Sequence, residues 1–306
     1  MKKVLAILVT LLVTANFVPA LATDLSPSIA VIDTGTDPAL FGNKIVAEAC
    51  FVESYSCPNG KSSMDGSGAS LIPPTTNDAL NHGTQMLSII RKVNPNANLI
   101  PIRIVGISPK GVPGLYTLAS VKLALDWVIT NQAKYNIAVV SLSQGGVKPN
   151  CKVPDGMVAQ FATLKALNIP VVTAVGNNSN KTEINAPACI PDAVAVGGTD
   201  NPDPSVRPIA WDPSAAPYIG RYNNISAQVD FYANARWFAT NRDGSTKFKV
   251  GSSNATASVA AWWLLNRKES FDATYRFLFD SATTAKNEFT TGKYIFIDSL
   301  KMGNNL

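Results

Sequence analysis

Segments with two different patterns of apolar and polar residues alternate along the chain. Five short segments are almost wholly apolar and rich in Val, Ile and Ala, as is typical of strands buried on both faces of a parallel sheet. They cover residues 28–33, 98–106, 137–143, 169–177 and 192–200. In residues 117–136 and 157–168, apolar residues recur at three- and four-residue spacing, which predicts helices. This alternation predicts an α/β fold with three layers: a mostly parallel central sheet with helices on both faces.

Other segments carry weaker patterns. Residues 58–77, rich in Ser, Gly and Pro, are expected to form a long exposed loop, and residues 201–221, with five prolines, an irregular surface excursion. Residues 257–268 and 272–282 have a helical pattern, and residues 293–300 read as a final strand. No repeat or linker interrupts the chain, so we expect one domain over residues 23–306.

The first 22 residues have the features of a secretory signal peptide. Lys2 and Lys3 precede a short apolar stretch, and the segment ends in the small-x-small pattern of Ala20 to Ala22. We therefore expect cleavage before Thr23 and a secreted or periplasmic protein. The apolar stretch is too short and broken for a transmembrane anchor, and no later segment has the roughly 18 apolar residues of a membrane span.

Composition and net charge limit the classes of partner that we expect for this protein. Hydrophobic residues make up 46% of the 306 residues and charged residues 15%, which supports a sizeable core and argues against disorder. The net charge is +5, and removing the two leader lysines leaves 5 − 2 = +3. So weak a positive charge predicts neither a nucleic-acid partner nor stable association with a membrane after signal cleavage. We expect a monomer.

Four cysteines add a constraint on the chain. An even number in an exported protein predicts disulfides. Of the three possible pairings, Cys50 with Cys57 and Cys151 with Cys189 is the simplest. A zinc site is disfavoured, because the chain has a single histidine and no CxxC motif.

The segment IAVIDTGTD, residues 29–37, is compatible with two unrelated protease chemistries. In an aspartic protease, Asp33 would share a proton with a second carboxylate, because two carboxylates at that distance do not both ionise. That chemistry requires a second Asp-Thr/Ser-Gly motif, which the chain lacks. The alternative is that Asp33 orients a histidine.

Three further motifs supply suitable groups. The single histidine, His82, precedes the apolar helical segment 85–93, which places its imidazole near a helix N-terminus. Ser252 and Ser253 follow a glycine and open another helical segment, where a hydroxyl is exposed and backbone N–H groups can bind an oxyanion. Asn177 follows an apolar strand, so its amide is expected at the carboxyl edge of the sheet as an oxyanion donor.

Together the four motifs, in the order Asp, His, Asn, Ser, resemble the subtilisin-like serine proteases over nearly the whole mature chain. The resemblance implies an endopeptidase that acts on proteins or peptides by acyl transfer. It implies Asp33, His82 and Ser253 as the catalytic triad, with Ser253 preferred over Ser252 because it stands third in Gly-Ser-Ser. It further implies Asn177 as the oxyanion donor. The substrate-binding residues implied are Ser141, Leu142, Ser143 and Gly176.

Departures from the family pattern mark a divergent member. Asn254 replaces the family's Met, Ala257 its Pro, and Ser143 a common Gly. Only about ten residues precede Asp33 after the expected cleavage site, so we expect no recognisable prodomain. The rival interpretation is a catalytically inactive relative that serves as a secreted binding protein.

We predict no cofactor and no metal. Asp37, Asp65 and Asp78 could bind a structural calcium ion, as family members often do, but no calcium-loop spacing supports such a site.

Overall fold

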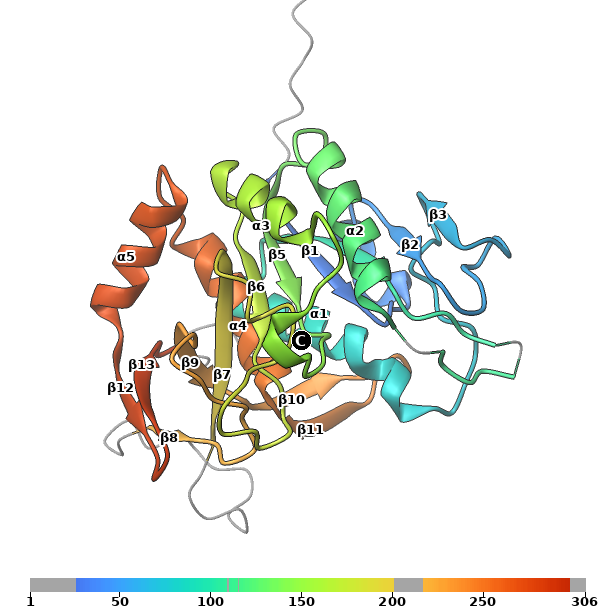
Figure 1. The fold of residues 1–306 in the computed structure, drawn as a ribbon. Helices are drawn as coiled ribbons and strands as arrows, with labels where there is room; N and C mark the ends of the chain where they lie inside the picture. Colours follow the sequence, from blue (N-terminus) through green and yellow to red (C-terminus); the bar gives the residue numbers. More distant parts are fainter. Residues whose placement is uncertain (1–25, 109, 115, 201–216, 298–306) are drawn as a thin grey trace, which may run out of the picture.

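A large, mostly parallel β-sheet forms the centre of the computed structural model, which describes residues 26–108, 110–114, 116–200 and 217–297 (Figure 1). Within these ranges the sheet has 11 strands. In spatial order they are β3 (Ser63–Asp65), β2 (Ala49–Phe51), β4 (Asn98–Arg103), β1 (Ser28–Asp33), β5 (Ile137–Leu142), β6 (Val171–Ala174), β7 (Ala193–Asp200), β8 (Tyr218–Ile219), β12 (Thr283–Lys286), β13 (Thr291–Tyr294) and β9 (Phe231–Asn234). β7 also pairs with β9, and all pairs from β2 through β7 to β9 are parallel. A separate hairpin joins β10 (Arg236–Thr240) to β11 (Thr246–Val250).

Helices cover both faces of this sheet (Figure 1). α2 (Leu118–Asn131) and α3 (Met157–Ala166) lie on one face, and α1 (His82–Val93) and α4 (Ser252–Leu265) lie on the other. α5 (Phe271–Ser281) follows α4. Successive side chains of a strand point to opposite faces. Ile29 and Val31 of β1 accordingly join the core beneath α1 and α4, whereas the alternate residues of β1 join the core beneath α2 and α3. The predicted three-layer α/β fold is confirmed.

The helix α4 is buried on nearly all sides. Ala, Ser and Thr dominate its sequence, and these short side chains allow the helix to pack against β5, β6 and β7. A helix that is apolar or small all round belongs inside a protein. Because α4 is held in this way, its first turn, which contains Ser253, has a fixed position at the edge of the sheet.

The predicted elements are present, several of them with shifted or shorter bounds. The segments 98–106 and 169–177 form strands only over Asn98–Arg103 and Val171–Ala174, and the helix expected over 117–136 ends at Asn131. The predicted final strand is found as β13, which starts two residues early and ends at Tyr294. The expected signal peptide, the excursion up to residue 216 and the end of that strand (298–300) lie outside the described residues.

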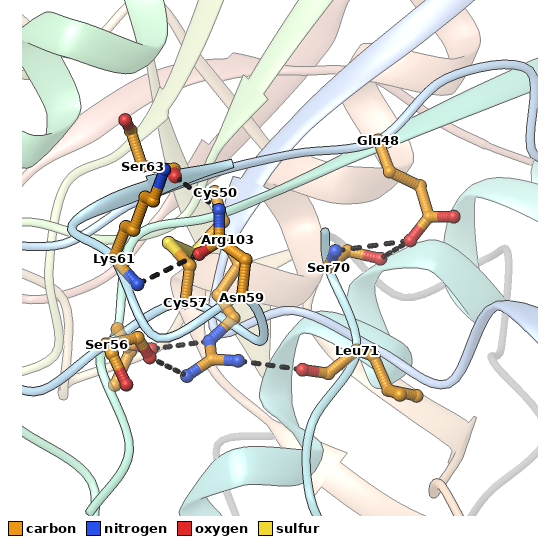
Figure 2. Close-up of a disulfide and its surroundings, with 11 residues drawn as sticks. Glu48, Cys50, Ser56, Cys57, Asn59, Lys61, Ser63, Ser70, Leu71 and Arg103 are labelled. Carbon is orange, nitrogen blue, oxygen red and sulfur yellow. Dashed lines mark hydrogen bonds between the residues drawn. A yellow bond between two sulfur atoms is a disulfide. The ribbon is translucent and has the colours of Figure 1, made fainter. Parts of the chain in front are cut away.

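The expected loop 58–77 is more ordered than predicted. It contains β3, and its residues 68–70 are held by Glu48, whose carboxylate accepts hydrogen bonds from the backbone N–H groups of Gly68 and Ser70 and from the Ser70 hydroxyl. Figure 2 shows the bonds between Glu48 and Ser70, together with Arg103, which donates to the carbonyls of Ser56 and Leu71. Polar anchors at Glu48 and Arg103 therefore fix a segment that lacks an apolar pattern.

Two disulfides are formed, Cys50–Cys57 and Cys151–Cys189, which is the simplest of the three pairings. The first lies next to the Arg103 contacts (Figure 2). None of the helices in the described ranges has the length and apolar character needed to cross a membrane.

Candidate active site

Asp33 and His82 lie in contact at the carboxyl end of the central strand β1. β1 ends at Asp33 and α1 begins at His82, as predicted for both motifs. The Nδ1 atom of His82 lies 2.8 Å from Oδ1 and 2.9 Å from Oδ2 of Asp33. The Asp33 side chain is 2% exposed and that of His82 is 28% exposed. The carboxylate is therefore enclosed, while the imidazole keeps an open side.

Hydrogen bonds between the two motifs hold this pair together. The hydroxyl of Thr34 accepts a hydrogen bond of 2.9 Å from the backbone N–H of Gly83. The hydroxyls of Thr36 and Thr84, both fully buried, lie 2.9 Å apart. Gly35 between the two threonines has a φ of +97°, which favours glycine, and the Ser70 carbonyl leaves no room for a Cβ there. The Asp-Thr-Gly-Thr turn thus docks on His-Gly-Thr.

Opposing effects set the proton affinity of His82. Burial lowers the pKa of His82, but the negative charge of Asp33 and the hydrogen bond to it raise the pKa, and the net result lies above the ordinary value of 6.5. The positive charge of Lys249 lowers it slightly. Because Nδ1 faces a carboxylate, the ring proton belongs on Nδ1, and Nε2 is left free to accept a proton.

Ser253 lies in the first turn of α4, as predicted, and is 8% exposed. It lines a cavity of about 560 Å³ together with His82 and Asn177. Ser252 lines the same cavity, but its hydroxyl donates to Oδ1 of Asn177 at 2.9 Å. This contact engages Ser252 and distinguishes the two serines.

Asn177 is oriented by the start of α4. Its Oδ1 atom accepts hydrogen bonds of 2.9 Å from both the backbone N–H and the hydroxyl of Ser252. The amide oxygen is therefore turned toward Ser252, and the Nδ2 group is the end of the amide that can donate to another molecule.

The four predicted substrate-binding residues separate into two pairs. Ser143 and Gly176 line the cavity. Ser141 and Leu142 are buried inside β5, where they pair with β1 and β6, and they are not among the lining residues. The part of this segment that faces the cavity therefore begins at Ser143, two residues later than predicted.

Gln144 was missed by the sequence reasoning. Its Nε2 atom lies 3.1 Å from Oδ1 of Asp33 and 3.1 Å from Nδ1 of His82. No local motif marks it. Its position follows from the strand register, because β5 pairs in parallel with β1, with Leu142 opposite Ile32, so residues just past the end of β5 lie near Asp33.

The three acids considered for calcium have other contacts or positions. Asp37 accepts from the backbone N–H of Ala39 at the start of a 3₁₀ turn, and Asp65 ends β3. Asp78 accepts hydrogen bonds of 3.1 Å from Lys247 and from Lys249, which lower its pKa to about 2. In the described part of the chain, no three His, Cys, Asp or Glu side chains gather as metal ligands would.

A family model places these motifs in context: the model of the subtilase family matches residues 25–274. The chain belongs to the subtilase family. An alkaline protease of Alkalihalobacillus alcalophilus is 30% identical over 144 residues, which are 44% of this chain and 34% of that protein. This subtilase therefore matches only about a third of that relative's length. Thermitase of Thermoactinomyces vulgaris is 26% identical over 236 residues, covering 76% of this chain and 71% of thermitase.

Solved structures show the same fold. The crystal structure of a cold-adapted subtilisin-like serine proteinase superposes with a TM-score of 0.61 at 21% identity, and 89% of each chain is covered. At this identity the likeness concerns the fold, which agrees with the arrangement of sheet and helices described above.

Proposed function

We propose that this subtilase is an exported serine endopeptidase that hydrolyses peptide bonds through an acyl-enzyme on Ser253. The observation that carries the proposal is the contact of His82 Nδ1 with the Asp33 carboxylate at the wall of the cavity that Ser253 also lines. Export is supported by the leader pattern of residues 1–22 and by the two disulfides.

In the first half of the reaction, the Ser253 hydroxyl attacks the peptide carbonyl carbon and gives its proton to Nε2 of His82. Asp33 holds the ring in the required tautomer and stabilises the imidazolium that forms. The C–N bond then breaks, and His82 returns the proton to the leaving amine. In the second half, water attacks the ester by the same route and releases the acid, and Ser253 regains its proton.

The negative oxygen of the tetrahedral intermediate needs donors in place before the reaction. The Nδ2 group of Asn177 serves as one, because Ser252 already holds the amide oxygen. The backbone N–H of Ser253 serves as the second, since helix geometry leaves the first N–H groups of α4 without partners inside the helix. Removing one such donor typically lowers kcat about 10²–10³-fold.

An extended peptide is the substrate we expect to fit beside residues 143–145. These residues continue β5 past the point where β1 ends, and all three line the cavity. A peptide that adds as a strand forms main-chain hydrogen bonds, which tolerate many sequences. Broad endopeptidase activity is therefore favoured over cleavage of a single sequence.

Labelling with a fluorophosphonate probe tests the proposal, because the probe reacts with an activated serine. We expect wild-type protein and Ser252→Ala to be labelled, and Ser253→Ala to remain unlabelled. If correctly folded wild-type protein is not labelled, the inactive binding protein replaces the enzyme. If Ser252→Ala loses labelling while Ser253→Ala keeps it, the nucleophile is Ser252.

A further inference from the structure

We propose that Gln144 is a positioning residue for the Asp33–His82 pair: its side-chain amide fixes the plane of the Asp33 carboxylate and so the orientation of the imidazole. The inference rests on the proposed function, because it assigns Gln144 a role in the same site. Gln144 comes from the segment after β5, whereas Asp33 ends β1 and His82 begins α1. A third element of the fold thus reaches the pair.

The chemistry of the atoms determines which bond Gln144 makes. Nδ1 of His82 lies within 2.9 Å of both carboxylate oxygens, so it carries a proton and donates. The Nε2 group of Gln144 is also a donor and cannot donate to a protonated Nδ1. Although it lies 3.1 Å from both atoms, it therefore donates to Oδ1 of Asp33.

The two carboxylate oxygens of Asp33 are held unequally as a result. Oδ1 accepts from the backbone N–H of Thr34 at 2.7 Å, from Gln144 at 3.1 Å and from His82 at 2.8 Å. Oδ2 accepts from His82 at 2.9 Å. The bonds from Thr34 and Gln144 come from two separate segments, so the carboxylate cannot rotate without breaking at least one of them. A fixed carboxylate plane in turn fixes the ring that it binds.

The amide also acts on the charge of the imidazole. The positive end of the Gln144 amide dipole lies 3.1 Å from Nδ1, where it opposes a positive charge on the ring, and it offsets part of the Asp33 charge. Among the described residues, the other charged groups that act on His82 are Asp33 on β1 and Lys249 on β11, with Asp78 bound to Lys249. Tyr116, before α2, lies near Asp33. Removing the amide therefore favours the imidazolium and raises the pKa of His82.

The single histidine of the chain makes this effect directly measurable. We would titrate the His82 imidazole by NMR in the Ser253→Ala protein, which prevents self-digestion, with and without Gln144→Met. Met keeps the length of Gln and removes the donor. We expect the titration midpoint to rise by about 0.5 to 1 pH unit with Gln144→Met, and further with Gln144→Glu, which adds a negative charge.

Gln160→Met is the matched control. The Gln160 amide also donates to a carboxylate, that of Asp126, but it does so between α3 and α2 on the other face of the sheet. Its loss should leave the His82 midpoint unchanged. In the protein with Ser253 intact, Gln144→Met should lower kcat about tenfold, because orientation of the base acts on the chemical step. KM should change little, because the substrate is expected to pair with the main chain of residues 143–145 and not with the Gln144 side chain.

Failure of this inference is distinguishable from failure of the proposed function. A midpoint that stays or falls with Gln144→Met would overturn the positioning role, even if stability is reduced. If Gln144→Met does not fold, Gln144→Leu, which also removes the donor, is titrated in its place. An absence of fluorophosphonate labelling in wild-type protein would instead overturn the proposed function, and the NMR titration would still report whether Gln144 acts on His82.

Discussion

Single side chains around His82 set its pKa, and so the pH range in which it could act as the proposed base. His82 must be neutral to accept a proton, so kcat/KM should rise with pH through its pKa. Lys249 lowers that pKa by its positive charge. The variant Lys249→Met should therefore raise the pKa of His82 and move the acid limb of the kcat/KM profile to higher pH, by about 0.3 to 0.5 unit.

Salt should weaken this effect, because the Lys249 side chain is 29% exposed and its charge is screened. Profiles at low and high ionic strength measure the difference. Asp78→Asn should move the limb the opposite way, since it removes the carboxylate that partly neutralises Lys249. Lys122→Met, on α2 across the sheet, is the control. An unchanged limb in Lys249→Met at low salt would contradict the prediction.

At the same scale, local sequence motifs were enough to predict three candidate catalytic residues. Asp33, His82 and Ser253 each stand beside glycine, threonine or serine in a recognisable order. Gln144 has no such motif, and its contact with Asp33 arises only when β5 pairs with β1. Contacts between distant segments depend on strand register, which local patterns do not specify.

At the scale of elements, the docking of the turn after β1 on α1 can be tested at the buried contact of Thr36 and Thr84. Replacing either threonine by Val leaves the other hydroxyl buried without this partner, which should reduce the free energy of unfolding by about 1–3 kcal/mol. Replacing both removes the pair together, so the double variant should lose clearly less than the sum of the single losses. Urea unfolding in the Ser253→Ala protein measures all three variants.

Thr130→Val is the control for this double-mutant cycle of Thr36 and Thr84. Thr130 lies on α2, where its hydroxyl donates to the backbone carbonyl of Asp126 in an exposed position. Its loss should change stability by less than about 0.5 kcal/mol. Additive losses at Thr36 and Thr84 would mean that the two hydroxyls are not coupled.

The central strands could be predicted from the sequence because both of their faces are buried. Each therefore reads as a continuous apolar segment, as in β1, β4 and β5. Two of the strands that were missed, β3 and β11, lack this signal, whereas β9 is largely buried but only four residues long. β3 has the sequence SMD and β11 the sequence TKFKV, both largely exposed, and their pairing depends on neighbours rather than on their own apolar residues.

For the whole molecule, the two disulfides constrain very different lengths of chain. Cys50–Cys57 spans 7 positions and starts within β2, next to the edge strand β3, whereas Cys151–Cys189 spans 38 positions. The longer loop begins after β5 and ends before β7, and it includes α3, β6 and Asn177. This second bridge therefore ties together the segments that carry the proposed oxyanion donor.

Loop length predicts which bridge contributes more to stability. In the chain-entropy description, a bridge reduces the freedom of the unfolded chain by an amount that grows with the loop it closes. The Cys151→Ala, Cys189→Ala double variant should lose about 4 kcal/mol of unfolding free energy, and the Cys50→Ala, Cys57→Ala double variant about 2 kcal/mol. Urea unfolding in the Ser253→Ala protein compares them, with non-reducing peptide mapping to verify the remaining bridge. Equal losses, or a larger loss for the short loop, would show that local packing around Arg103, rather than chain entropy, governs what these bridges contribute.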